Sequence, residues 1–174
     1  MPLRVISCTR AHAPAILAIY NEAIANSTAL WDYKPRTMQM MHDWFDAKER
    51  GCFPVIGVVD DNGTLAGFGT YGTFRERPAY KYTVEHSVYV EQTFRARGIG
   101  RMLLREVIAA AKAQELHVLV GGIAAGNDVS IKLHESFGFT YAGTIKQAGF
   151  KFGQWLDLLF YQLVLPTPTQ PVDG

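Results

Sequence analysis

The residues between Arg95 and Gly100 have the composition of an anion-binding turn. Two arginines and two glycines follow a strand-like segment, 88–90, and precede an apolar helical pattern that starts near Gly98. Glycine lets the backbone approach a ligand closely, and the free N–H groups at the start of a helix attract anions. Arg95 and Arg97 add fixed positive charge. The spacing therefore predicts a turn that holds a phosphate-bearing ligand, with an ordinary strand–turn–helix corner as the alternative.

This turn differs from two better-known phosphate loops. It lacks the Gly-Lys-Ser/Thr ending of a Walker loop and the three spaced glycines of a dinucleotide fingerprint. A second run, 67–72, matches the dinucleotide pattern by letter, but it lies within a predicted strand and no helix follows it. We interpret the glycines of that run as sites of close packing or of a bulge.

The totals exclude several classes of protein. With 174 residues, the chain is expected to form one domain with a sizeable core. Its net charge of +1, without a Lys/Arg run, does not favour nucleic-acid binding. Cys8 and Cys52 are too few for a disulfide framework and fit a reducing compartment. No apolar run suits a signal peptide or a membrane span. We expect a cytoplasmic globular protein without nucleic-acid or membrane partners.

Hydrophobic periodicity and turn residues predict the elements along the chain. They are a strand at 3–7, helices that start after Thr9 and at Thr37, strands at 54–59, 65–73 and 83–90, a helix from about 98 to 114, a strand at 118–123, a helix from Asn127 or Asp128 to about 137, and strands from 141 to 145 and from 155 to 165. This order predicts an α/β (α+β) fold with a central mixed, mainly antiparallel sheet and helices on both faces. Residues 1–165 would form the domain and 166–174 a flexible tail.

The turn 95–100 resembles the Arg/Gln-x-x-Gly-x-Gly/Ala pyrophosphate loop of the GCN5-related N-acetyltransferases, and the order of elements matches their fold. Segments 83–90, 133–139 and 149–157, with 19–21 and 44–45, are similar to the phosphinothricin and methionine sulfoximine N-acetyltransferases. The resemblance covers nearly the whole chain. It implies an acyl-CoA N-acyltransferase fold, acetyl-CoA as cosubstrate, no metal, and a detoxification-type transfer to the α-amino group of a small glutamate- or methionine-like amino acid.

Acetyl transfer needs a neutral amine and a proton for the departing thiolate. An α-amino group has a pKa of roughly 8, so a base is useful. Glu85 resembles the catalytic glutamate of the family, and burial would raise its pKa toward the useful range; a surface ion pair is the alternative. His134 stands where many relatives carry the tyrosine that protonates the thiolate. It is predicted to be that acid or to relay a proton with Glu85, with a structural role or Tyr141 as the alternatives.

The resemblance also assigns binding residues. Those for acetyl-CoA are Val88, Tyr89, Val90, Arg95, Ala96, Arg97, Gly98, Ile99, Gly100, Arg101, Asn127 and Ser130. The strand would pair with the pantetheine arm and donate an amide to the oxyanion, and the turn would hold the pyrophosphate. Helix capping is the alternative for the last two. The residues predicted to contact the amino acid are Trp31, Arg75, Glu76, Arg77, Glu85, His86 and Ser87.

Within that substrate set, the Arg75 guanidinium would pair with the carboxylate of the amino acid. The sequence of the segment 76–78 differs from that of several relatives, which leaves the selectivity for the substrate side chain open. For Trp31, the alternative to substrate contact is a position in the hydrophobic core. Relatives are dimers with the pocket near the interface, and the hairpin at 151–153 could reach a partner. His12, His42 and His117 lack metal-like spacing.

Two other functions are compatible with the sequence. The first is acetylation of a polyamine, an aminoglycoside or a protein N-terminus, although the near-neutral charge does not favour a strongly cationic substrate. The second is a catalytically silent module that binds acetyl-CoA. The presence of both Glu85 and His134 beside an intact loop disfavours the silent module.

Overall fold

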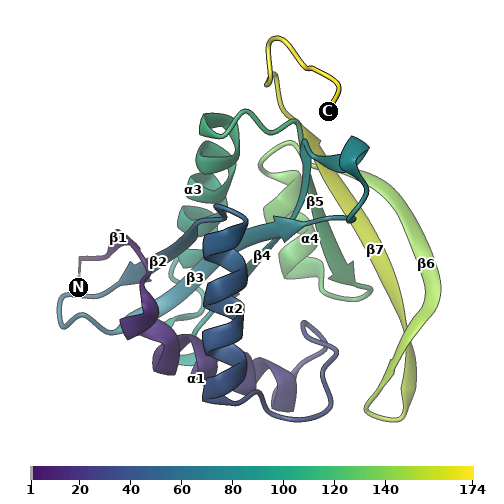
Figure 1. The fold of residues 1–174 in the computed structure, drawn as a ribbon. Coiled ribbons are helices and arrows are strands. Elements are labelled where there is room, and N and C mark those ends of the chain that lie inside the picture. Colours follow the sequence, from purple (N-terminus) through teal and green to yellow (C-terminus); the bar gives the residue numbers. More distant parts are fainter. Residues whose placement is uncertain (1) are drawn as a thin grey trace. The chain divides into compact units, whose positions relative to one another are not determined.

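The computed structural model describes residues 2–174 (Figure 1). The chain divides into two compact units. The amino-terminal unit holds the residues up to 72 together with 87–107, and the carboxy-terminal unit holds 73–86 and 108–174. The division falls within β4, so this strand contributes residues to both units. Backbone hydrogen bonds link the strands in the order β1-β2-β3-β4-β5-β7-β6.

The elements follow the predicted order. They are β1 (Arg4–Ser7), α1 (Ala13–Asn26), α2 (Met38–Arg50), β2 (Val55–Val59), β3 (Leu65–Thr73), β4 (Thr83–Val90), α3 (Ile99–Ala113), β5 (Val118–Ala124), α4 (Asp128–Glu135), β6 (Thr140–Lys151) and β7 (Gln154–Val164), with short 3-10 helices at Arg10–His12, Pro78–Tyr80 and Gln92–Phe94. β4 pairs with β5 in parallel, whereas β1–β2, β2–β3, β5–β7 and β6–β7 are antiparallel. The sheet is therefore mixed and mainly antiparallel, as predicted.

In the amino-terminal unit, helices cover both faces of the strands. One core joins α1 and α2 to β2 and β3 through Ile16, Ile19, Tyr20, Met41, Phe45, Val59 and Phe68. The other core joins the start of α3 to the same two strands through Val58, Ala66, Ile99 and Leu103. Val58 and Val59 belong to different cores because successive side chains of a strand point to opposite faces.

The starts of α1 and α2 show how capping residues set the helix ends. Thr37 caps α2, since its side chain accepts a hydrogen bond from the Met40 N–H at 3.2 Å, as predicted. The sequence placed Thr9 at the start of α1, but Thr9 instead begins the 3-10 helix that leads into it. Pro14 lies in the first turn of α1, where its missing N–H costs nothing.

Two glycines of β3 lie against α3. A Cβ at Gly67 would be 3.1 Å from Leu103 Cδ1, and one at Gly69 would be 2.9 Å from Val107 Cγ2. The helix therefore approaches the strand as closely as glycine allows. This close packing supports a structural interpretation of the glycines in β3.

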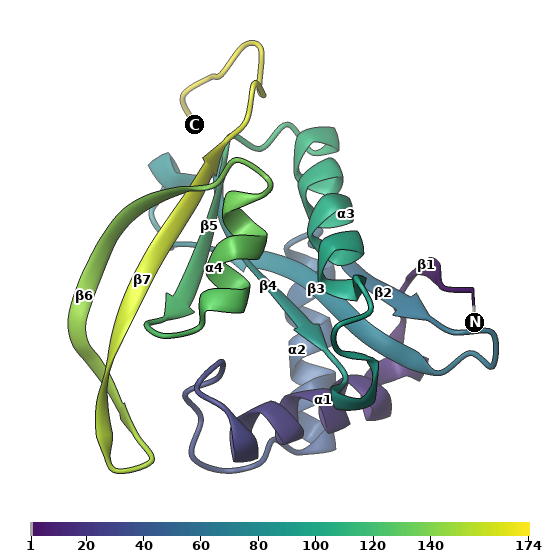
Figure 2. The same cartoon turned by 180° about the vertical axis from the view of Figure 1, so that it is seen from behind.

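In the carboxy-terminal unit, β5 pairs with the first half of β4 on one side and with β7 on the other. β6 and β7 form a long two-stranded ribbon (Figure 2). The sequence predicted that a strand begins at 141–145, and β6 continues from there to Lys151. Two register shifts, after Tyr141 and after Ile145, interrupt the alternation from which the strand was predicted.

Residues 166–174 make specific contacts within the carboxy-terminal unit. The Thr167 hydroxyl donates to the carbonyl of Leu116, and His117 Nδ1 donates to the Thr167 carbonyl at 2.6 Å. Farther along, the Val172 N–H donates to the Tyr82 hydroxyl at 3.2 Å. Within residues 2–174, no helix has the length and apolarity that a bilayer crossing requires.

Candidate active site

Two histidines form a buried pair in the carboxy-terminal unit. His86 of β4 and His134 of α4 are each 6% exposed, and their Nε2 atoms lie 2.8 Å apart. The Phe139 ring packs against both, with centroid distances of 5.2 and 5.0 Å. The sequence had assigned His86 to substrate contact, but the structure places it inside the unit, against His134.

The hydrogen bonds of this pair fix the position of each proton. His134 Nδ1 lies 2.7 Å from the Ser130 carbonyl oxygen, which only accepts, so Nδ1 carries the proton of the neutral ring. His134 Nε2 is then an acceptor, and His86 Nε2 must donate to it. His86 Nδ1 is left as an acceptor, and among residues 2–174 it has no hydrogen-bond partner of regular geometry.

Burial keeps both rings neutral. Desolvation, together with the neighbouring His134, lowers the pKa of His86 to about 3, and only the Val120 backbone opposes this shift. Desolvation also lowers the pKa of His134, against the Ser130 carbonyl, which favours the protonated ring. Neither ring carries a charge at neutral pH, and both nitrogens of His134 are engaged within the unit.

Two consecutive glycines of β5 make room for the residues of β4. A Cβ at Gly121 would be 3.1 Å from His86 Cε1 and 3.3 Å from His134 Nε2. A Cβ at Gly122 would be 3.3 Å from Glu85 Oε1. Sequence analysis missed both glycines, although two adjacent glycines inside a predicted buried strand were a signal of close approach.

Glu85 points to the other face of β4 from His86, as strand alternation requires. Its side chain is exposed to solvent, yet the atoms around it partly desolvate the carboxylate and raise its pKa. The guanidinium of Arg75 opposes this rise electrostatically. The structure therefore places Glu85 within the electrostatic reach of Arg75, and it connects His134 to His86 rather than to Glu85.

The remaining predicted substrate residues of the 75–77 segment are exposed, and Arg75 also lies over the Phe74 ring at 5.3 Å. Tyr141, the alternative acid, is 57% exposed, and its hydroxyl lies 2.6 Å from Thr144 Oγ1. The described residues contain no group of three or more His, Cys, Asp or Glu side chains placed to hold a metal ion.

The predicted phosphate turn lies in the amino-terminal unit, at the start of α3. Ala96 and Gly98 both have positive φ, 62° and 78°. The Gly98 carbonyl accepts from the Met102 N–H at 3.1 Å and so begins the helix. No atom lies within 4 Å of a Cβ placed on Gly98, so the left-handed backbone, and not crowding, requires glycine there. The open space beside Gly98 and the helix start that follows it fit an anionic ligand.

Two contacts hold the arginines of the turn. Arg95 forms an ion pair with Glu22 of α1, with Nη2 and Oε2 separated by 2.6 Å. The Arg97 guanidinium lies 5.2 Å from the centroid of the Phe94 ring. Both arginine side chains are exposed, so each can give up its present contact and bind a ligand at a small cost in free energy.

The predicted cofactor contacts on α4 have capping geometry. Asn127 Oδ1 accepts from the Ser130 N–H at 3.2 Å, which makes Asn127 the N-cap of the helix. Ser130 Oγ lies 3.4 Å from His134 Nδ1. Asn127 therefore caps the helix, which was the alternative to cofactor binding. Ser130 is connected to the histidine pair through its backbone carbonyl.

The loop that carries Trp31 is fixed by Asn21 of α1. Asn21 Nδ2 donates to the Arg36 carbonyl at 3.1 Å, and its Oδ1 accepts from the Arg36 N–H at 2.8 Å. The Arg36 guanidinium lies over the Tyr20 ring at 4.1 Å and bonds Asp32. The Trp31 indole N–H donates to Thr28 within the same loop. These contacts give a physical reason for the Tyr-Asn pair that the resemblance had singled out.

Comparison with known proteins bears on the family to which the chain belongs. The family model described as "Acetyltransferase (GNAT) domain" matches residues 5–160. The chain is 45% identical over 162 residues to the L-methionine sulfoximine/L-methionine sulfone acetyltransferase of Pseudomonas paraeruginosa, covering 92% of this chain and 94% of the relative. It is 35% identical to the phosphinothricin N-acetyltransferase of Streptomyces viridochromogenes, covering 98% and 93% of the two chains.

A solved structure extends the comparison to the backbone. The GNAT superfamily phosphinothricin acetyltransferase from Sinorhizobium meliloti, in complex with acetyl-CoA, matches with a TM-score of 0.94 and 30% identity. The match covers 100% of this chain and 95% of that one. The fold, the acetyltransferase class and the subfamily resemblance inferred from the sequence are confirmed. The chain therefore belongs to the GCN5-related N-acetyltransferase (GNAT) family of acetyl-CoA-dependent enzymes.

Proposed function

We propose that this acetyltransferase moves the acetyl group of acetyl-CoA to the α-amino group of a small glutamate- or methionine-like amino acid, such as methionine sulfoximine, methionine sulfone or phosphinothricin. The observation that supports the proposal is the electrostatic influence of the Arg75 guanidinium on the partly desolvated Glu85 carboxylate. An amino acid presents an amine and a carboxylate a short distance apart. Glu85 would accept the proton of the amine while Arg75 binds the carboxylate.

In the proposed mechanism, Glu85 removes a proton from the ammonium form of the substrate, directly or through water, because only the neutral amine attacks. Its raised pKa suits this role. A backbone N–H of the 88–90 segment stabilises the oxyanion that develops on the carbonyl. The thioester supplies an activated acyl group, and collapse of the tetrahedral arrangement releases the thiolate of CoA.

His134 is the proposed proton source for that thiolate, with a condition set by the structure. Its proton is on Nδ1 and is donated to the Ser130 carbonyl, while His86 occupies its Nε2. Transfer from His134 therefore requires Nδ1–H to turn from the carbonyl, or to pass through the Ser130 hydroxyl 3.4 Å away. Tyr141, whose hydroxyl is exposed, is the second candidate for the acid.

For the cosubstrate, we propose that residues 88–90 pair with the pantetheine arm and that the turn 95–101 holds the pyrophosphate. The positive φ of Ala96 and Gly98 supports this assignment, because successive amides in such a turn point toward a common anion. Asn127 and Ser130 remain proposed pantetheine contacts. Trp31, Glu76, Arg77, His86 and Ser87 remain proposed substrate residues, of which His86 would act through His134.

We further propose that residues 1–165 form one catalytic domain, with 166–174 as a tail held in part by Thr167 and Val172. The proposed assembly is a cytoplasmic homodimer without nucleic-acid or membrane partners. Exposed aromatic side chains on the β6–β7 ribbon, Phe150, Phe152 and Trp155, support a partner surface there. Two free cysteines fit a reducing compartment.

Release of the CoA thiol tests the proposed activity. The purified chain is incubated with acetyl-CoA and, in separate reactions, methionine sulfoximine, methionine sulfone, phosphinothricin, spermidine and an N-terminal peptide. We expect turnover on the amino acids and little on the last two. Turnover confined to spermidine or the peptide would overturn the substrate class. Tight CoA binding with no turnover on any amine would favour the silent module.

A further inference from the structure

A cavity of about 480 Å³ lies in the amino-terminal unit, at the carboxyl end of α2. None of its lining residues belongs to the proposed active site. They are Ser7, Cys8, Thr9, Arg10, Ala11, Phe45, Lys48, Glu49, Cys52, Phe53, Pro54 and Val55. Its size is typical of a small-molecule site, and Lys48 is its only lysine.

Lys48 is held in place by uncharged groups. Its Nζ donates to the Tyr71 carbonyl at 2.7 Å. The rings of Trp44 and Phe53 lie 5.2 and 5.7 Å from Nζ. The carbonyl accepts a hydrogen bond from either form of the amine, so it positions Nζ without requiring a charge.

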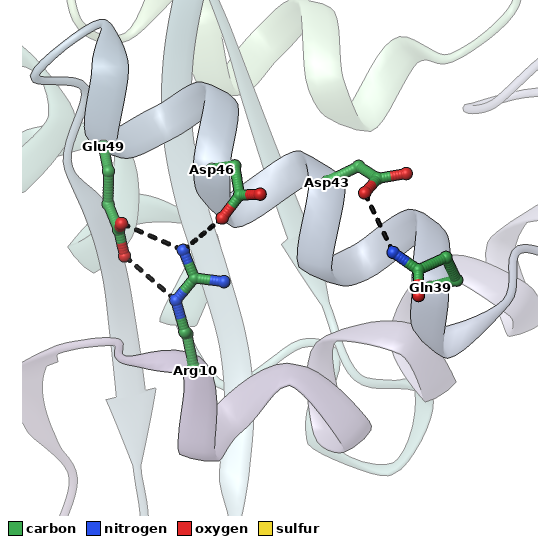
Figure 3. Close-up of polar contacts among 5 residues, drawn as sticks. All are labelled: Arg10, Gln39, Asp43, Asp46 and Glu49. Carbon is green, nitrogen blue, oxygen red and sulfur yellow. Dashed lines mark hydrogen bonds and ion pairs between the residues drawn. The ribbon is translucent and has the colours of Figure 1, made fainter.

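The acidic residues near Lys48 on α2 are engaged elsewhere. Asp46 and Glu49 both bind Arg10, at 2.5 and 2.9 Å (Figure 3). Across the described chain, no carboxylate lies within the 4.0 Å of an ion pair to Lys48 Nζ. The amine is therefore partly desolvated without a counter-ion, and burial lowers its pKa to about 8.

Three other titratable groups around the cavity, Cys8, Tyr71 and Arg10, do not supply a competing nucleophile. Burial raises the pKa of the Cys8 thiol to about 11 and that of the Tyr71 phenol to about 12, so both are neutral near pH 8. Arg10 stays charged within its ion pairs. Near pH 8, Lys48 is the lining amine that holds a lone pair in a substantial fraction of molecules, and Cys52 is the one exposed thiol beside it.

We propose that Lys48 is a site of covalent acetylation by acetyl-CoA, separate from the catalytic transfer. The neutral Nζ attacks the thioester carbonyl, a C–N bond forms, and the C–S bond breaks. The proton lost by Nζ passes through solvent to the departing thiolate, which leaves as the CoA thiol. The product is an Nε-acetyl-lysine, which can still donate its amide N–H to the Tyr71 carbonyl.

The test compares Lys48 with Lys112, an exposed lysine on a helix. The folded protein is incubated with millimolar acetyl-CoA at pH 8, and acetylation of each lysine peptide is followed by mass spectrometry over time. We expect Lys48 to react at least about tenfold faster than Lys112, because a far larger fraction of it is neutral. In urea, the two rates should become equal. Equal rates in the folded protein would overturn the proposal.

Variants separate direct attack from two other routes. Glu85→Gln should leave acetylation of Lys48 unchanged, since the proposed reaction does not use the catalytic centre. Cys52→Ser should also leave it unchanged; loss of labelling in either variant would overturn direct attack. Lys48→Arg, checked for folding by circular dichroism, should retain acetyltransferase activity on free amino acids and lose only the Lys48 signal.

Discussion

His86 Nε2 donates a hydrogen bond to His134 Nε2 across 2.8 Å inside the carboxy-terminal unit. The Ser130 carbonyl, which holds the proton of His134 on Nδ1, makes His134 Nε2 the acceptor of this bond. The two residues are 48 positions apart in the chain, and strand alternation places Glu85 and His86 on opposite faces of β4. The strand thus carries the proposed base on one face and a member of the buried histidine pair on the other.

Removing the carboxylate charge in Glu85→Gln should lower kcat by about 10²- to 10⁴-fold at neutral pH, as is typical for loss of a general base. At high pH, where the substrate amine is already neutral, kcat should fall least. Steady-state rates from pH 6 to 10 check this expectation. An unchanged rate at pH 7 would contradict the role of Glu85.

Replacing Arg75 by Met should raise the pKa of Glu85 further, because the guanidinium now lowers it. The acid limb of kcat/KM should move to higher pH, and KM for the amino acid should rise as the carboxylate loses its partner. Arg77→Met serves as the matched control on the same segment. Equal effects of the two variants would show that Arg75 has no special place at the site.

The histidine pair predicts a pH dependence of stability. The pKa of His86 is about 3 in the folded chain and near the ordinary histidine value of 6.5 in the unfolded chain, so the unfolded chain binds the extra proton between these limits. The contribution of His86 is complete above pH 6.5 and is lost as pH falls toward 3. The slope from this one group is at most about 1.4 kcal/mol per pH unit.

Urea unfolding at pH 7.5, 6.0 and 5.0 measures that slope. In His86→Gln the contribution of His86 is absent, so the free energy of unfolding should fall less steeply with decreasing pH than in the wild type. His12→Gln is a suitable control, since His12 lies near the surface in a 3-10 helix. Parallel pH profiles for the wild type and His86→Gln would exclude a buried neutral His86.

Adding a methyl group at the two glycines of β5 should have different effects. Gly121→Ala forces the His86 and His134 rings apart, and we expect a loss of about 1–3 kcal/mol in the free energy of unfolding. Gly122→Ala meets the mobile end of Glu85 at 3.3 Å, so activity should fall with a stability cost below about 1 kcal/mol. The free energy of unfolding and kcat are measured for both variants. A larger stability loss in Gly122→Ala and a larger activity loss in Gly121→Ala would contradict the assignment of Glu85 and His86 to opposite faces of β4.

Asn21→Ala should loosen the Trp31 loop, because it removes two hydrogen bonds to the backbone of Arg36. We expect faster tryptic cleavage after Arg36 and a higher KM for the amino acid, with little change for acetyl-CoA. Gln39→Ala removes only an exposed contact to Asp43 and is the control (Figure 3). Identical cleavage rates in the two variants would show that Asn21 does not hold the loop.

The order of elements was predictable because each helix and strand carries its own period and caps. The turn at Gly98 was predictable too, since positive φ at a helix start favours glycine. The pairing of His86 with His134 was not, because it depends on which segments the sheet brings together and no local pattern encodes that. The need for glycine at position 121 was not predictable either, because it arises from the two histidine rings that pack against this position in the folded chain.

Gly67 and Gly69 allow α3 to lie close to β3, and the proposed pyrophosphate turn leads directly into that helix. A larger residue at either position would move the start of α3 away from β3, and the turn that precedes the helix would move with it. Changes in preference among acyl donors of different length can therefore arise in the middle of β3. In directed evolution of this enzyme, these two inner positions belong in the library beside the residues that line the acyl group itself.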